Sequence, residues 1–267
     1  MQNDRHNEIM RIISLRKRVS VALLTSRLRV SEVTIRKDLT ILEEMGYLVR
    51  TRGGATLAED WENHRVLGVR RGENTAEKVA IAEAALQLVQ EGDTLYLDSG
   101  STCAALARRL SAMNLRVVTN SIDVIIVLGE APGIALHSVG GSYRKEAGSF
   151  IGPAAIESLS GYQIDIAFLG TTGFSHTGEF SAQNLIEAEL KKAVSRRAKR
   201  TVVLADHSKF GSSAFAVFAR VEDVDLVVMD EFPGAMQVTA LGCEVVFARP
   251  TGNGRIINGG EQRGIHG

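Results

Sequence analysis

The chain has 267 residues, of which 45% are hydrophobic and 23% charged, and its 31 Lys and Arg residues balance 31 Asp and Glu residues. This length suits two domains, and the composition is that of a soluble globular protein. No apolar run reaches the ~18 residues of a membrane span and the start of the chain is unlike a signal peptide, so we expect a cytoplasmic protein with no membrane partner. Two isolated cysteines and six histidines without metal-ligand spacing predict no disulfide, metal or cofactor.

The charge is unevenly distributed along the chain. Residues 1–57 carry 11 Lys and Arg against 6 Asp and Glu, a net charge of +5, whereas the remaining residues carry −5. Because phosphate contacts supply most of the affinity for nucleic acid, a polyanion would be attracted to the N-terminal part alone.

Three short helices are predicted in the first 45 residues. Ser20 and Ser31 are candidate N-caps, and a turn of about three residues at 29–31 joins the second helix to the third, as in helix-turn-helix units. Each helix has apolar residues at helical spacing: Ile9, Ile12 and Ile13; Val21, Leu24 and Leu28; Ile35, Leu39 and Leu42.

The third helix and the segment after it offer side chains that suit DNA. Gly46 is a plausible helix end, and residues 47–55 predict a strand and a Gly-Gly turn, which form a wing. Asp38 is expected to orient a neighbouring Arg or Lys, and a solvated charged face is the plainer alternative for the whole surface. The predicted DNA-binding residues are Val33, Thr34, Arg36, Lys37, Thr40, Arg50 and Arg52, with Arg36 ranked first.

Residues 5–55 resemble the N-terminal domain of the DeoR family of bacterial transcriptional regulators. Thr25 and Arg29 depart from the family pattern, since a small Ala and often a Gly stand at these positions. The matching positions are Val30-Ser31, Thr34-Ile35-Arg36, Lys37, Asp38-Leu39, Leu42-Glu43, Gly46, Arg50 and Gly53-Gly54-Ala55.

The rest of the chain predicts a linker at 58–76, a second domain at 77–249 and a flexible tail at 250–267. In the second domain, apolar strands alternate with helices, which indicates an α/β fold with a mostly parallel sheet covered on both faces. Strands are expected at 93–100, 115–120, 134–141, 164–173, 200–206, 224–230 and 243–248, and helices at 77–89, 101–113, 121–130, 152–160 and 184–198.

The strand ends of this domain are polar or rich in glycine. Ligands of open α/β sheets bind outside the carboxyl ends of the strands, and the start of the helix at 101 offers hydroxyls and free backbone N–H groups to a phosphate. A role in helix caps and turns would explain the polar residues of any single loop, but five such loops at one edge of the sheet favour a ligand-binding site. The five strand ends are 98–102, 119–121, 140–141, 170–173 and 206–209.

These loops resemble the C-terminal sensor domain of the DeoR family, whose fold is similar to ribose-5-phosphate isomerase and the CoA-transferase group. The resemblance implies a repressor of a sugar-catabolism operon, with a phosphorylated sugar or polyol as effector. Ser101 replaces the family's usual Thr and keeps the hydroxyl. Carried over, the effector residues are Ser99, Gly100, Ser101, Thr102, Asn120, Gly141, Arg144, Gly170, Glu187, Lys191 and Lys209.

Two other functions stay open. An isomerase could use Glu187, Asp165, Asp206 and Lys209 as base and electrophile, and a purely architectural DNA binder would need no polar strand ends. For a regulator we expect a homo-oligomer, a dimer or tetramer, that binds double-stranded operator DNA and whose DNA affinity changes when the effector binds.

Overall fold

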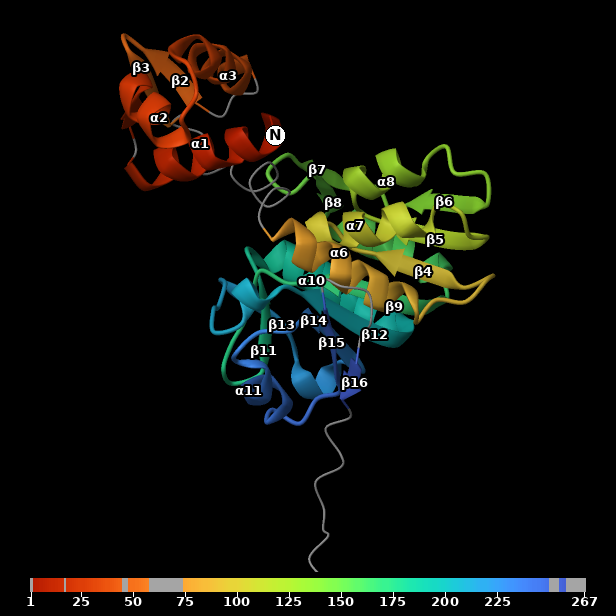
Figure 1. Cartoon of the computed structure of the whole chain (residues 1–267). Coiled ribbons are helices and arrows are strands. Elements are labelled where there is room, and N and C mark those ends of the chain that lie inside the picture. Colours follow the sequence, from red (N-terminus) through yellow and green to blue (C-terminus); the bar gives the residue numbers. More distant parts are fainter. Residues whose placement is uncertain (1, 17, 45–47, 58–73, 250–254, 258–267) are drawn as a thin grey trace, which may run out of the picture. The chain divides into compact units, whose positions relative to one another are not determined.

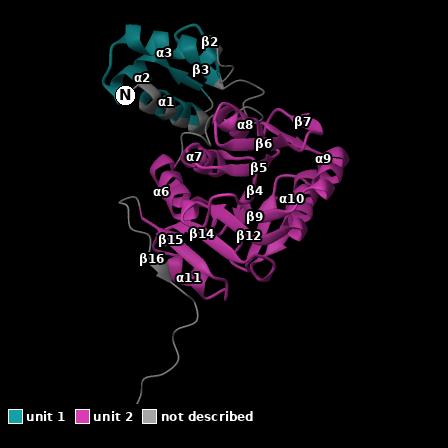
Figure 2. Ribbon diagram, turned by 90° about the vertical axis from the view of Figure 1, so that its right-hand side faces the viewer, with its two compact units in different colours: residues 1–73 teal, residues 74–267 magenta. Residues whose placement is uncertain are grey.

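The computed structural model describes residues 2–16, 18–44, 48–57, 74–249 and 255–257, and the chain divides into two compact units, residues 1–73 and 74–267 (Figure 2). The predicted linker at 58–76, except for its last three residues, lies outside the described residues. So does most of the predicted tail at 250–267. Residues 74–76 belong to the second unit, because helix α6 (Thr75–Leu86) begins two residues before the predicted domain start. None of the described helices is long and apolar enough to cross a membrane.

The first unit contains the three predicted helices and the predicted wing (Figure 1). The short strand β1 pairs antiparallel with β3 and so completes a three-stranded sheet in the order β1-β3-β2. Three residues are too few to show a sequence period, so β1 was not predicted. The elements are α1 (Gln2–Arg16), β1 (Arg18–Ser20), α2 (Val21–Leu28), α3 (Glu32–Glu44), β2 (Leu48–Thr51) and β3 (Gly54–Leu57).

Both predicted N-caps of the first unit are confirmed, whereas the predicted helix end at Gly46 lies outside the described residues. Ser20 Oγ accepts a hydrogen bond from Leu23 N at 3.1 Å, and Ser31 Oγ accepts one from Thr34 N at 3.2 Å, so both serines cap helices. Arg29 has φ 54°, the left-handed conformation that favours glycine at a helix end, which explains why the family often has Gly there. The apolar stripes meet in one core that includes Ile9, Ile13, Leu24, Ile35, Leu39 and Leu42.

The second unit is built on an eight-stranded sheet in the order β16-β15-β14-β12-β9-β4-β5-β6. All pairs are parallel except β15 with β16. The predicted parallel sheet is therefore confirmed. Its strands are β4 (Thr94–Leu97), β5 (Leu115–Thr119), β6 (Ile134–Ser138), β9 (Ile164–Gly170), β12 (Ala198–Ala205), β14 (Leu226–Asp230), β15 (Val245–Ala248) and β16 (Arg255–Ile257).

Layers cover both faces of the sheet, since successive strand residues point to opposite faces. Leu95 and Leu97 join the core beneath α6, α7 (Ser101–Leu110) and α8 (Ile122–Leu128), whereas Tyr96 joins the core on the other side. That second layer holds α9 (Pro153–Ser158), α10 (Leu185–Arg197), α11 (Ala235–Thr239) and a small sheet of β10 (Gly173–Phe174), β11 (Glu179–Ala182) and β13 (Ala216–Arg220). Short 3₁₀ turns lie at Leu159–Gly161, His207–Lys209 and Val221–Asp223.

A hairpin that was not predicted lies beside the carboxyl ends of the strands. It consists of β7 (Ser142–Arg144) and β8 (Ser149–Ile151), which pair antiparallel. Phe150 N donates to Asn120 O at 2.8 Å and Ile122 N donates to Gly148 O at 2.9 Å, so the backbone of the hairpin is joined to the loop after β5.

Candidate functional site

The outer face of α3 carries the side chains expected to meet DNA. Ile35 and Leu39 are fully buried, whereas Val33 is 78% exposed and Arg36 and Lys37 are also exposed. The helix thus uses one stripe for the core and presents the other outward. Thr34, which is half-buried, hydrogen-bonds Ser31 at the start of the helix, its Oγ1 lying 2.9 Å from Ser31 Oγ.

The wing is tied to the same helix. Arg50 donates from its guanidinium to Thr40 Oγ1 at 2.9 Å and from its backbone N–H to Glu43 at 2.8 Å. Arg52, beside the Gly-Gly turn, is exposed. All seven predicted DNA-binding residues therefore lie on the outward part of α3 or on the wing, and their contacts with DNA stay predictions.

Asp38 faces inward and joins α3 to α1. Its carboxylate accepts hydrogen bonds from Arg5 at 2.6 and 3.0 Å and lies 2.9 Å from Nε2 of His6. Burial alone would raise the pKa of Asp38, but the hydrogen bonds from Arg5 and His6 outweigh it and hold the pKa below its ordinary value. The expectation that Asp38 orients a cation is confirmed, and the partner comes from a helix that the sequence pattern did not connect to it.

A buried ion pair lies where β4 and β9 end. Lys191 of α10 donates to Asp98 and, at 2.9 Å, to Gly170 O, while Gly170 N donates to Asp98 at 3.0 Å. Burial would lower the pKa of Lys191, but the carboxylates of Asp98 and Glu187 outweigh it and raise the pKa, so this ammonium is charged. Both side chains of the pair are almost completely buried.

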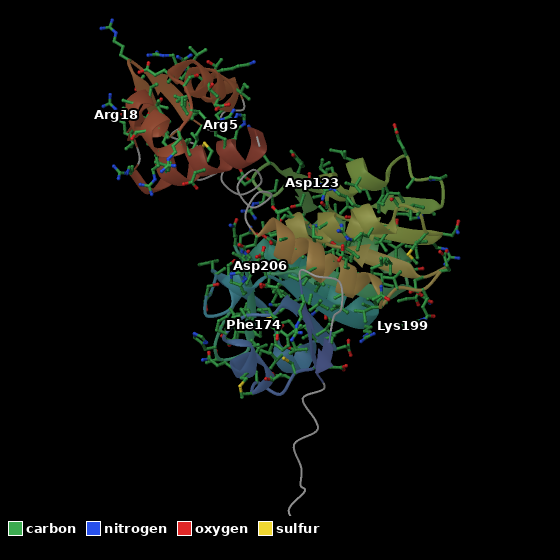
Figure 3. The ribbon with its side chains drawn as sticks, viewed as in Figure 1. Arg5, Arg18, Asp123, Phe174, Lys199 and Asp206 are labelled. Carbon is green, nitrogen blue, oxygen red and sulfur yellow. The ribbon has the colours of Figure 1, made fainter. Side chains whose placement is uncertain are left out.

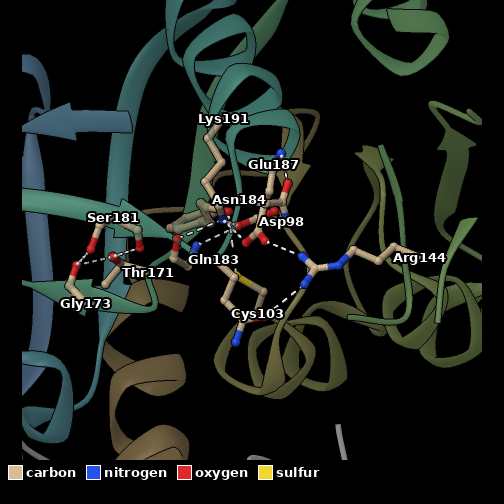
Figure 4. Close-up of polar contacts among 12 residues, drawn as sticks. Asp98, Cys103, Arg144, Thr171, Gly173, Ser181, Gln183, Asn184, Glu187 and Lys191 are labelled. Carbon is tan, nitrogen blue, oxygen red and sulfur yellow. Dashed lines mark hydrogen bonds and ion pairs between the residues drawn. The ribbon is translucent and has the colours of Figure 1, made fainter. Parts of the chain in front are cut away.

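A second ion pair adjoins the first and is more accessible. Figure 4 shows Arg144, from the hairpin, pointing toward Glu187 and Gln183; its guanidinium donates to them at 2.9 and 3.0 Å. Glu187 lies 3.8 Å from Lys191, one helical turn along α10. Asp98, Lys191, Glu187 and Arg144 thus form a row of alternating charge, and an anionic ligand would compete with carboxylates that already neutralise both cations.

The loop before α7 supplies hydroxyls and backbone N–H groups. Gly100 has φ +126° at the N-cap position and makes no side-chain cap, while Ser99, Ser101 and Thr102 are half-buried. Cys103, next along the helix, is buried, and burial raises the pKa of its thiol, which fits a core residue.

Two further predicted residues lie beside the hairpin. Asn120 follows β5 and is 1% exposed. Gly141 has φ +105°, and a Cβ there would lie 2.7 Å from the carbonyl oxygen of Ile151. Glycine is therefore required for the two hairpin strands to approach each other. Gly141 thus has a structural role in the hairpin in addition to its predicted role in effector binding.

Lys209 occupies the same edge of the sheet but a different cluster. Its Nζ is 4.0 Å from Asp206, which also accepts from Asn74 at 2.9 Å and from Ser208. Burial would raise the pKa of Asp206, yet Lys209 and these hydrogen bonds lower it. Lys209 thus pairs with Asp206, whereas Lys191 pairs with Asp98 and Glu187.

Asp165 is in the wrong place for the isomerase alternative. It lies at the start of β9, where it accepts from Lys199 at 2.7 Å and from Thr94 N at 2.8 Å. Lys199 and Asp206 are at opposite ends of β12 (Figure 3). Since β9 and β12 run parallel, Asp165 is a strand length away from the polar strand ends and cannot act with them.

Comparison with known proteins matches both units of the chain. The family model described as the DeoR-like helix-turn-helix domain matches residues 5–60, and the model described as the DeoR C terminal sensor domain matches residues 73–231. The chain belongs to the DeoR family of transcriptional regulators.

Several relatives that align with most of this DeoR-family chain are named as repressors. The HTH-type transcriptional repressor GlcR of Bacillus subtilis is 34% identical over 87% of this chain and 90% of its own length. The glycerol-3-phosphate regulon repressor of Escherichia coli is 31% identical over 89% and 95%. Ribose 5-phosphate isomerase A of Methanocaldococcus jannaschii is similar with a TM-score of 0.40 and 23% identity over 52% of this chain and 55% of that one, a likeness that carries no argument about activity.

Several polar contacts of the DeoR-family site were not predicted. Asn74 fell inside the predicted linker, and Gln183 follows a short strand without a sequence period. His207 donates its backbone N–H to Asp230 at 2.6 Å, and its Nδ1 lies 2.5 Å from the same carboxylate. The polar ends of the strands at 200–206 and 224–230 were visible in the sequence, but their pairing depends on β12 and β14 being neighbours.

Proposed function

We propose that this DeoR-family regulator represses an operon for the use of a carbohydrate or polyol, and that a phosphorylated sugar or polyol at the strand ends changes its affinity for operator DNA. The observation that carries the proposal is the presence, in one chain, of an outward basic face on α3 and a row of charges at the strand ends of an α/β unit. The names of relatives support it, since several are named as repressors and one of these is named for the glycerol-3-phosphate regulon.

The DNA-binding part rests on exposure and charge. Arg36 and Lys37 lie on the outward face of a helix of the length that fits the major groove, within a segment of net charge +5. Among the described residues, the guanidinium of Arg36 contacts the exposed Glu32 alone, at 3.3 Å, an interaction that a guanine or phosphate would readily replace. Two such helices in a homo-oligomer, a dimer or tetramer, would read paired half-sites.

The effector part rests on the chemistry of the strand ends. The N–H groups at the start of α7 and the guanidinium of Arg144 suit a phosphate, while the amide of Asn120 suits hydroxyl groups. A phosphorylated polyhydroxy compound carries both a phosphate and hydroxyl groups, and this class of ligand is therefore favoured over a neutral sugar.

Operator binding by the purified full-length protein tests the proposal. DNA fragments selected from the source genome give the operator, and fluorescence anisotropy then compares wild type with Arg36→Ala. Loss of one base-edge contact is worth roughly 1–3 kcal/mol, so the variant should bind the operator about tenfold more weakly or worse.

Arg196→Ala is the matched control, because Arg196 is an exposed arginine of α10 in the other unit. It should bind as wild type does. Selection of no preferred sequence, or equal affinity of wild type and Arg36→Ala, would contradict the proposed role of α3.

A further inference from the structure

Asn120 has a buried side chain whose hydrogen-bonding capacity is unused. The residue is 1% exposed, and within the described part of the chain neither Oδ1 nor Nδ2 has a hydrogen-bond partner. Over the described ranges, the hydroxyl groups of Thr25 and Tyr96 are also buried without a hydrogen-bond partner. A buried amide with no partner is costly, so its presence beside polar strand ends indicates that a ligand supplies the partners.

The backbone on both sides of Asn120 is fixed. Thr119 Oγ1 donates to Leu97 O at 2.6 Å and accepts from Ser121 N at 3.0 Å, while Asn120 O accepts from Phe150 N of the hairpin at 2.8 Å. The main chain that carries the Asn120 amide is therefore held in place at the end of β5.

The hairpin that binds Asn120 has a second attachment. On the far side, Arg144 is held by Glu187 at 2.9 Å and by Gln183 at 3.0 Å. The side chains of Arg144 and Glu187 are 21% and 13% exposed, so the pair is accessible to a small solute. Backbone hydrogen bonds thus join the hairpin to the loop after β5. The guanidinium of Arg144 joins it to Glu187 and Gln183 (Figure 4).

We propose that a phosphorylated ligand binds at the junction of β5, α10 and the β7–β8 hairpin, where its phosphate takes Arg144 from Glu187 and its hydroxyl groups hydrogen-bond to Asn120. This inference rests on the function proposed above and adds the event that couples binding to the fold. Arginine binds phosphate through two parallel hydrogen bonds, and the dianion carries more charge than the carboxylate that it replaces.

The released carboxylate has another partner at hand. Glu187 lies 3.8 Å from Lys191, so it can move toward that ammonium when Arg144 leaves. The ligand therefore replaces a contact within the protein with one that it makes itself, and the hairpin is held differently in the bound and free states. A difference of this kind is what a ligand must have in order to shift a conformational equilibrium.

Glu187→Gln separates this proposal from direct recognition of the ligand by Glu187. The variant removes the carboxylate of Glu187 and leaves Arg144 with Gln183, at 3.0 Å, and Glu146, at 3.6 Å. Hydrogen–deuterium exchange of residues 142–151 in the free full-length protein should therefore rise several-fold, and a phosphorylated probe should bind more tightly. The probes are inorganic phosphate, sn-glycerol 3-phosphate and glucose 6-phosphate, each organic phosphate compared with its unphosphorylated parent. Glu189→Gln, which removes an exposed partner of Lys192 on the same helix, should change neither quantity.

Asn120→Ala tests the second half of the proposal. The free protein should have an unchanged or higher melting temperature, because the variant removes unpaired polar atoms, while probe affinity falls by about tenfold. A lower melting temperature with unchanged probe affinity would overturn the role of Asn120, and weaker probe binding in Glu187→Gln with unchanged hairpin exchange would overturn the role of Arg144. A wild-type protein that binds its operator but no phosphorylated probe contradicts the proposed effector class. If the wild type binds a probe and both Glu187→Gln and Asn120→Ala bind it as wild type does, the proposed site at Arg144 and Asn120 is overturned while the effector class stands.

Discussion

Asp38 shows how one acidic side chain serves a basic, DNA-reading unit. It is buried on the inner side of α3, where Arg5 and His6 bind it, and so it fixes α3 against α1. The residue type and the position were visible in the sequence, but the partner is 33 residues away and depends on how α1 packs against α3.

Asp38→Asn should destabilise the protein by about 1–3 kcal/mol at neutral pH, because it weakens hydrogen bonds to a charged group. The folded-state pKa of Asp38 is lowered from 3.8, so its stabilisation is present above that pH and is lost as the pH falls through the folded value. Thermal unfolding followed by circular dichroism at pH 7 and near pH 3 measures the difference. The stabilities of wild type and variant should converge at the lower pH. A difference in stability that is the same at both pH values would show that the charge of Asp38 is not what stabilises the unit.

Arg29 shows the limit of reading single residues. The departure from Gly was visible, yet only the structure shows that the backbone keeps the left-handed conformation with an arginine in it, at φ 54°. The family turn is thus retained against the local preference, because the packed faces of α2 and α3 determine it.

At the level of elements, the long periodic segments were predicted and the short ones were not. The parallel strands and their helices appear at the expected places because each buries a continuous apolar face. By contrast, the short strands have only two to five residues each, and they form by pairing with other segments of the chain. These strands are β1, β7 and β8 of the hairpin, and β10, β11 and β13 of the small sheet. The geometry of the candidate site was therefore the least predictable part, because Arg144 is positioned by one of the unpredicted hairpin strands.

Gly141→Ala should disrupt that hairpin. A Cβ would lie 2.7 Å from the carbonyl oxygen of Ile151, and φ +105° is unfavourable for alanine, so β7 and β8 cannot keep their approach. Binding of phosphorylated probes should fall by at least about tenfold, as expected when a positioned guanidinium is lost, while operator affinity without ligand stays within a factor of about two. Isothermal titration calorimetry and anisotropy measure the two affinities.

Gly161→Ala is the control for that substitution, since a Cβ added there would have nothing within 4 Å and the φ of Gly161 is not in the left-handed range. It should behave as wild type. If Gly141→Ala bound the probes normally, the hairpin would have no part in the site.

At the level of the whole molecule, two units of opposite net charge are expected to bind two different anions. The charge of +5 belongs to residues 1–57 and that of −5 to the rest, so nonspecific attraction to DNA falls on one unit while the other relies on specific contacts. This division was predictable from composition and motifs, because it needs no knowledge of pairing between distant residues.

If one ligand regulates the other, their affinities are linked in both directions. A phosphorylated probe that changes operator affinity by some factor must have its own affinity changed by the same factor when operator is present. Anisotropy titrations of DNA with and without probe, and calorimetric titrations of probe with and without DNA, should give equal factors, typically about 5–150-fold. Factors that differ beyond error would mean that a third equilibrium, such as assembly, intervenes.

The start of α10 restricts where the chain can tolerate insertions. Asn184 caps the helix by accepting from Glu187 N at 2.9 Å, and the same helix then presents Glu187 and Lys191 one turn apart. One added residue after the cap would rotate everything beyond it by about 100°, carrying both side chains away from Arg144 and Asp98. Changes in length are therefore far easier to accommodate in the turn at 129–133, which no charged pair of the site depends on.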